Sequence, residues 1–106
     1  MSSSFGRRFR LSPQAIEDLI QIYNYLQTRN PIAAERLTSD LEQKIRELAG
    51  SRNPGVSRDW VKTGLRAFPY RHRCIYFRIA DDMLIVLRVM HGRQDISPND
   101  FPESDP

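Results

Sequence analysis

Apolar residues repeat at three- and four-residue steps in two stretches of the first half of the chain, which is the spacing of one helix face. In residues 13–28 this apolar stripe consists of Ile16, Leu19, Ile20, Tyr23 and Leu26. In residues 32–49 a narrower stripe consists of Leu37, Leu41, Ile45 and Leu48. The pattern predicts two helices whose apolar stripes face a common core.

Capping residues and helix breakers mark the ends of both predicted helices. Ser12 can cap free backbone N–H groups, and Pro13 suits the first helical position because a donor is not needed there. The sequence Arg-Asn-Pro at residues 29–31 ends the first helix and begins the second. We expect Gly50 to end the second helix in a left-handed turn. The short connection predicts an antiparallel helical hairpin.

The second half of the chain has the period of two that is typical of β-strands. Residues 51–63 have no clear period and are interpreted as a loop, after which runs at residues 64–70, 73–79 and 83–90 are separated by short turns. Residues 8–11 alternate as a short edge strand would. The predicted class is α+β: an N-terminal strand and a two-helix hairpin, packed on one face of an antiparallel sheet of three to four strands.

Alternation divides the side chains of these strands between two faces. One set is expected to pack on the helices: Ile75, Phe77, Ile79, Ile85, Leu87 and Val89. The opposite face mixes arginines with aromatic and apolar residues: Arg66, Phe68, Tyr70, Tyr76, Arg78, Val86, Arg88 and Met90. A solvent-facing sheet surface is usually more simply polar. The sequence therefore predicts a solvent-exposed sheet face that binds a partner.

Composition adds an uneven distribution of charge. The 106 residues suit one domain, and 40% hydrophobic with 27% charged residues is a globular balance. The net charge is +3, but residues 50–96 alone carry +5 and residues 97–106 carry −3. We expect a single domain over residues 1–96, followed by an acidic tail over residues 97–106. The basic part should attract an anionic partner, either a nucleic acid or an acidic protein segment.

Several classes of protein are excluded by what the chain contains. Cys74 is the only cysteine, so no intrachain disulfide can form and a reducing cytoplasmic setting is expected. The longest apolar run is too short to cross a membrane, and the N-terminus lacks the apolar core of a secretory signal. No ligand spacing for a metal and no glycine-rich phosphate loop occurs, so no metal or cofactor is expected.

Arginine and histidine are the residues that can carry chemistry. Arg66, Arg78 and Arg88, with Arg93 beyond the last strand, suit phosphate or carboxylate groups, although simple pairing with surface acids is the alternative. His91 lies at the rim of the predicted sheet. With His72 and the arginines it can supply the acid, base and cations that RNA cleavage by a 2′-hydroxyl needs. A hydrogen-bonded structural role for His91 remains the alternative.

Five segments in a fixed order give the chain a family resemblance. They are residues 11–13, 30–37, 64–69, 76–78 and 87–95, which read LSP, NPIAAERL, GLRAFP, YFR and LRVMHGRQD. Together they resemble ParE-type toxins of the RelE/ParE superfamily over roughly residues 8–96.

The resemblance implies the toxin of a bacterial type II toxin–antitoxin system. It further implies a ParD-like antitoxin partner in a hetero-oligomeric complex, DNA gyrase as the target, growth arrest as the outcome and no enzymatic activity. The residues expected to bind the antitoxin or the target are Arg66, Phe68, Tyr70, Tyr76, Arg78, Arg88, Met90, His91 and Arg93.

Two other functions remain open at this point. One is a ribosome-dependent messenger-RNA endoribonuclease of the RelE type, relying on Arg78, Arg88, His91 and Arg93. Arg93 falls where such ribonucleases keep an arginine, but residues 97–100 stand where a tyrosine is expected. The other is an RNA-binding or scaffold module without toxicity.

Overall fold

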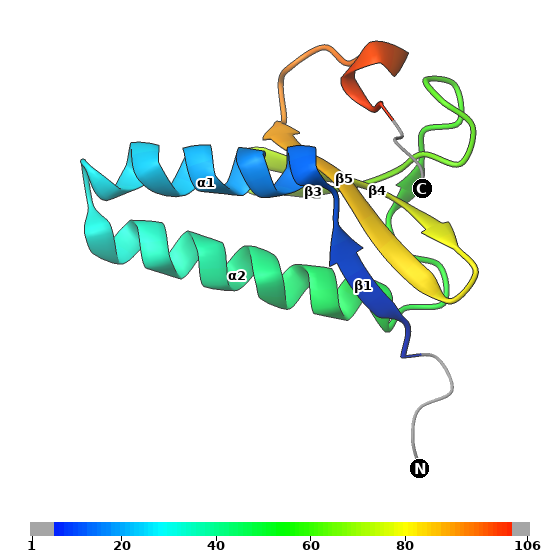
Figure 1. Cartoon of the computed structure of the whole chain (residues 1–106), viewed down its shortest axis with the longest axis horizontal. Helices are drawn as coiled ribbons and strands as arrows, with labels where there is room; N and C mark the ends of the chain where they lie inside the picture. The colour runs from blue at the N-terminus through cyan, green and yellow to red at the C-terminus, as the bar shows by residue number, and fades with distance from the viewer. Residues whose placement is uncertain (1–5, 103–106) are drawn as a thin grey trace.

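Two helices pack against one face of a five-stranded sheet in the computed structural model, which describes residues 6–102 (Figure 1). The helices are α1 (Pro13–Gln27) and α2 (Pro31–Ala49), and the strands are β1 (Arg8–Leu11), β2 (Val56–Ser57), β3 (Arg66–Tyr70), β4 (Arg73–Ala80) and β5 (Met83–His91). A short 3-10 helix, η1 (Pro98–Asp100), follows. The strand order is β1-β5-β4-β3-β2. The predicted α+β class is confirmed, with a sheet of five strands.

The sheet is mixed, because β1 runs parallel to β5 while all other neighbours are antiparallel. The two helices are antiparallel, and the turn that joins them lies at the end away from the strands (Figure 1). The predicted loop at residues 51–63 contains β2, which pairs with the outer edge of β3. Within residues 6–102, no helix is both long enough and apolar enough to cross a membrane.

Both helices begin where the capping residues predict. The Ser12 hydroxyl accepts a hydrogen bond from the Ala15 N–H at 3.0 Å, and the Asn30 side-chain oxygen accepts one from the Ala33 N–H at 3.1 Å. The left-handed turn expected at Gly50 is wrong, since its φ is −88°. The Gly50 N–H still donates to carbonyls of the last helical turn, and the backbone of Gly50 stays in the right-handed helical region as the chain leaves α2.

The principal core lies between the helices and the sheet. Its largest fully buried side chains come from α2 and from four positions of β4 and β5 that point toward the helices: Leu41, Ile45, Ile75, Phe77, Leu84 and Val86. Side chains that are less buried close the margins of this core, among them Phe9, Leu19 and Phe68. Burial of these apolar side chains holds the helical hairpin against the sheet.

The face predicted for β3 is wrong. Arg66 pairs with Phe77 and Phe68 pairs with Ile75, and directly opposed residues point to the same side of a sheet. Arg66, Phe68 and Tyr70 therefore point toward the helices rather than to an open surface. The alternation within β3 is correct, but the register with β4 decides which set faces the core.

The faces predicted for the first half of β5 are also wrong, because β5 contains a β-bulge. Phe77 pairs with Val86 while Tyr76 pairs with Arg88, which leaves Leu87 as an extra residue. Val86 therefore packs in the helix-side core, whereas Ile85 and Leu87 belong to the opposite face. Beyond the bulge the predicted faces are correct, since Val89 packs on the helix side and Met90 on the opposite side.

The second face of the sheet is covered by this chain's own segments, so the predicted open face of arginines and rings is wrong. Val61 and Leu65 from the loop before β3, and Phe101 after η1, pack with Tyr76 and Leu87 in a second apolar cluster. Phe101 is 0% exposed, and its ring meets that of Tyr76 at 5.0 Å between centroids. Residues 103–106 of the predicted acidic tail lie outside the described residues.

Replacement of Phe101 by Ala tests how strongly the C-terminal segment is bound to the sheet. We expect a loss of about 3 kcal/mol in the free energy of unfolding, because a fully buried ring is removed from its contacts. Trp60→Ala is the control, since this large side chain is 76% exposed, and should change the stability by less than about 0.5 kcal/mol. Urea denaturation of both variants provides the measurement, and equal effects would contradict this packing.

The buried phenol of Tyr76 makes stability depend on alkaline pH. Burial, aided by the adjacent Cys74 thiol, raises the pKa of Tyr76 to about 12, above the ordinary value of about 10. The folded state thus holds this proton more tightly than the unfolded state. The resulting stabilisation is complete below about pH 10 and is lost as the pH rises toward about 12.

Tyr76→Phe should therefore flatten this alkaline fall in stability. Urea unfolding of both proteins, at pH values on either side of the ordinary tyrosine pKa, measures the difference. An identical pH dependence in the wild type and the variant would contradict the burial of the phenol.

Candidate functional site

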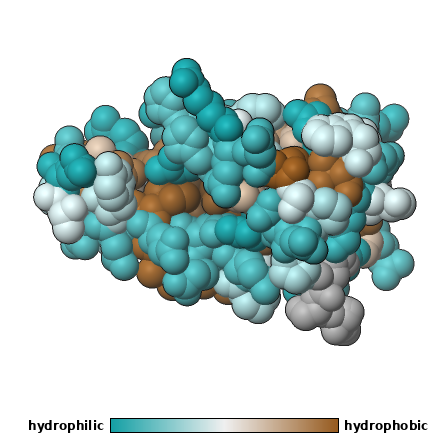
Figure 2. Space-filling view, turned by 90° about the horizontal axis from the view of Figure 1, so that it is seen from above, coloured by the Kyte–Doolittle hydropathy of each residue, from teal (hydrophilic) through white to brown (hydrophobic). Residues whose placement is uncertain are grey.

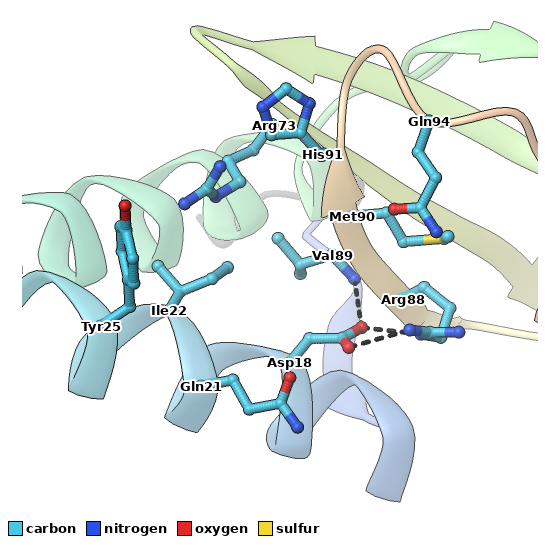
Figure 3. Close-up of a pocket in the computed structure, with 10 residues that line it drawn as sticks. All are labelled: Asp18, Gln21, Ile22, Tyr25, Arg73, Arg88, Val89, Met90, His91 and Gln94. Atoms are coloured by element: carbon cyan, nitrogen blue, oxygen red, sulfur yellow. Dashed lines mark hydrogen bonds and ion pairs between the residues drawn. The ribbon is translucent and has the colours of Figure 1, made fainter.

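A groove of about 370 Å³ lies between α1 and the second half of β5 (Figure 3). It exists because β1 is shorter than β5. The pairing of β1 ends with Leu11 opposite Val86, and the chain then turns into α1. The edge of β5 beyond this point faces a helix rather than another strand. The groove is lined by Asp18, Gln21, Ile22, Tyr25, Arg73, Arg88, Val89, Met90, His91 and Gln94.

An ion pair closes one end of this groove. Arg88 donates from Nε and from a terminal nitrogen to the two carboxylate oxygens of Asp18, at 2.7 and 2.9 Å (Figure 3). The carboxylate also accepts the backbone N–H of Val89 at 2.9 Å. The other terminal nitrogen of Arg88 donates to the Asp100 carbonyl at 3.1 Å. The site thus joins α1, β5 and the C-terminal segment.

Both partners of this ion pair are shielded from solvent, with side chains 23% exposed for Arg88 and 12% for Asp18. The hydrogen bonds to Asp18 raise the pKa of the Arg88 guanidinium, which therefore stays charged. Removal of either partner would leave a charge poorly solvated. Arg88 is thus committed to holding the groove together rather than free to bind a ligand.

Exposed apolar and aromatic side chains lie on two sides of α1. Tyr25, at the rim of the groove, is 56% exposed, whereas Ile16 and Ile20, which are 45% and 50% exposed, lie about half a turn around the helix from Asp18 and do not line the groove. Figure 2, which looks onto the molecule from above, shows hydrophobic surface between hydrophilic side chains. The rim of the groove at Tyr25, which has the backbone edge of β5 beside it, suits an extended or helical peptide.

The structure brings together only part of the predicted binding set. Arg88, Met90 and His91 line the groove, and Arg93 lies just beyond it, in a hollow that also reaches His91. His91 and Arg93 are exposed, but Met90 is 4% exposed and faces the second apolar cluster.

The remaining predicted residues make contacts within the chain. Arg66 donates to the Pro54 carbonyl at 2.6 Å and to the Asn53 side chain at 2.9 Å, so it holds the loop before β2. Phe68 and Tyr70 pack on the helix-side core, and Tyr76 lies under Phe101. Arg78 is half-buried on the second face, where it pairs across the strands with Ile85. These positions do not form one surface with the groove.

Sequence reasoning missed the contribution of α1 to the groove. Asp18, Gln21, Ile22 and Tyr25 follow the spacing of a second helical stripe, beside the apolar one, and this was the signal available. Within residues 6–102, no three side chains of His, Cys, Asp or Glu converge as metal ligands. The groove offers hydrogen-bonding groups, a basic side and an apolar wall, which together suit a peptide segment.

Comparisons with solved structures show similar folds in toxin–antitoxin systems. The structure is similar to a chain of the chromosomal ParDE toxin–antitoxin system from P. aeruginosa, with a TM-score of 0.71 and 21% identity over 83% of this chain and 98% of that chain. A chain of the RelBE2 toxin–antitoxin complex from Mycobacterium tuberculosis has a TM-score of 0.47 and 19% identity, over 81% of this chain and 98% of that chain. The comparison with curated proteins gives no significant match.

The family model described as the ParE toxin of the type II toxin–antitoxin system parDE matches residues 9–96. These residues include β1 from Phe9 onward, both helices and the whole of β5, and thus every residue that lines the groove. The likeness found in the ordered sequence segments is confirmed, and the chain belongs to the family of ParE toxins of type II toxin–antitoxin systems.

Proposed function

We propose that this chain is a toxin that a ParD-like antitoxin neutralises, and that it arrests growth by inhibiting DNA gyrase without catalysing a reaction. The observation that carries the proposal is the ParE family match over residues 9–96. The similar chain from P. aeruginosa also comes from a ParDE system, which supports an antitoxin of the ParD type. Because the proposed antitoxin and gyrase are cytoplasmic proteins, the proposed toxin acts in the bacterial cytoplasm.

The groove between α1 and β5 is the proposed antitoxin site. An incoming segment can form backbone hydrogen bonds along the edge of β5 beyond the Val89 N–H, which Asp18 already binds, and place apolar side chains against Ile22 and Val89. Arg73 and His91 favour acidic residues in that segment. We expect the antitoxin segment to fold on contact, so that a wide interface forms at an entropic cost.

The placement of the candidate acid–base residues supports a non-enzymatic toxin over a ribonuclease. Arg88 is engaged by Asp18, and Arg78 lies five positions along β4 from Arg73, the residue that pairs with His91. At the rise of a β-strand this separation is roughly 16 Å. The four residues on which a ribonuclease would rely therefore do not surround a single phosphate.

Purified toxin should block supercoiling by DNA gyrase when added in molar excess. The reason is that a ParE toxin acts on the enzyme by binding, so inhibition should need no turnover and should saturate with dose. A plasmid supercoiling assay measures the effect, and antitoxin added first should prevent it. Unaffected supercoiling together with newly cut transcripts in arrested cells would replace this proposal with the ribonuclease function.

Tyr25→Ala should weaken antitoxin binding roughly tenfold, because aromatic side chains at the rim of a groove commonly anchor interfaces. Trp60→Ala is the matched control: it also removes a large exposed ring, but one that lies outside the groove. Titration calorimetry with the purified antitoxin measures both affinities. Equal affinities for the two variants would place the antitoxin elsewhere on the toxin.

A further inference from the structure

A second hollow, of about 340 Å³, lies at the end of the sheet where the turn between β3 and β4, the end of β5 and the loop after β2 meet. Its lining contains four arginines and two histidines but no carboxylate: Arg58, Pro69, Arg71, His72, Arg73, Cys74, Tyr76, His91, Gly92 and Arg93. Such a concentration of one sign of charge in a concave site attracts anions.

Two of the four arginines at this hollow are directed toward the helices. Arg71 pairs with Asp40 of α2 at 3.6 Å and lies over the ring of Tyr70. Arg73 also lines the groove, and Figure 3 shows its guanidinium on the side of α1. These two side chains therefore add positive charge at the rim without being the main donors to a ligand.

Arg58 and Arg93 are the cations available inside the hollow. Neither forms an ion pair with a carboxylate within residues 6–102. Arg58 donates to the Ser57 carbonyl at 3.1 Å. Burial raises the pKa of the Cys74 thiol, which lines the same hollow, and the positive charge of Arg58 acts in the opposite direction. Two guanidinium groups in one hollow repel each other unless anions lie beside them.

We propose that this hollow binds two backbone phosphates of single-stranded nucleic acid, one at Arg58 and one at Arg93. Guanidinium groups bind phosphate in a bidentate way. The exposed rings of His72 and His91 stand beside them, where unstacked bases can pack.

A flexible single strand fits this site better than a duplex or an acidic peptide. A recessed phosphate site can be entered by a strand that bends, whereas a duplex holds its phosphates on a rigid, convex surface. An acidic peptide would use the arginines but would gain nothing from the flat rings at the mouth of the hollow. The proposal does not depend on gyrase being the target, because it concerns binding by the toxin alone.

Fluorescence anisotropy of the full chain with short labelled oligothymidine and oligouridine tests the site. The double variant R58Q/R93Q should bind roughly tenfold more weakly, and the slope of log Kd against log salt should fall by about 1.4, since two phosphate contacts are lost. R29Q/R36Q is the control, because it removes the same charge from two exposed arginines around the turn between α1 and α2. Its affinity should change much less.

Three outcomes would overturn the proposal. The first is an equal loss of affinity in both double variants, because net charge alone would then explain the binding. The second is displacement of the oligonucleotide by polyglutamate as effectively as by unlabelled oligonucleotide, which would point to an acidic protein. The third is binding of only one of the two nucleic acids, because a site that contacts phosphates does not distinguish the sugar.

If the double variant fails to fold, R93Q alone gives the same test at an exposed position, with a slope reduced by about 0.7. Circular dichroism melting of each variant establishes that it is folded before binding is measured. An unchanged slope in folded R93Q would also contradict the proposal.

Discussion

The buried hydroxyl of Ser12 joins the three elements on which the rest of the structure depends. It accepts the Ala15 N–H at the start of α1 and donates to the Leu87 carbonyl at 2.8 Å, while the Ser12 N–H donates to the Val86 carbonyl. One residue thus ends β1, caps α1 and holds the bulge of β5, and leaving these buried groups unpaired would be costly. Because α1 starts against β5, Asp18 reaches the strand two turns later.

The local elements of the fold could be predicted because their signals lie within short segments. Apolar stripes and caps marked the helices, and the period of two marked β3 to β5. The faces of the strands could not be assigned in the same way, because register depends on a neighbour and the bulge at Leu87 breaks the period without leaving a distinct residue pattern. Phe101 was missed for a related reason, since a single apolar residue in an acidic, proline-containing segment carries no period.

The candidate site was predictable only where its residues lie on the last strand. Met90 and His91 line the groove, but Asp18 and Tyr25 sit among helix positions that resemble an ordinary solvated face. Arg66 looked like a binding residue, although loop carbonyls occupy its guanidinium. The family could be predicted correctly even though the prediction of an uncovered sheet face was wrong. The family resemblance depends on the order of sequence segments along the chain, which is independent of where each side chain points.

The hydrogen bond from the Val89 N–H to Asp18 has a consequence for aggregation and for the order of complex formation. An uncovered strand edge can pair with any extended chain, and here a carboxylate from α1 already satisfies one of its donors. A protein segment that extends the sheet must either begin its ladder beyond Val89 or displace a charged group that Arg88 retains. Asp18 therefore disfavours pairing of other extended chains with β5 at Val89. A partner whose backbone contacts begin farther along the edge of β5 can still bind.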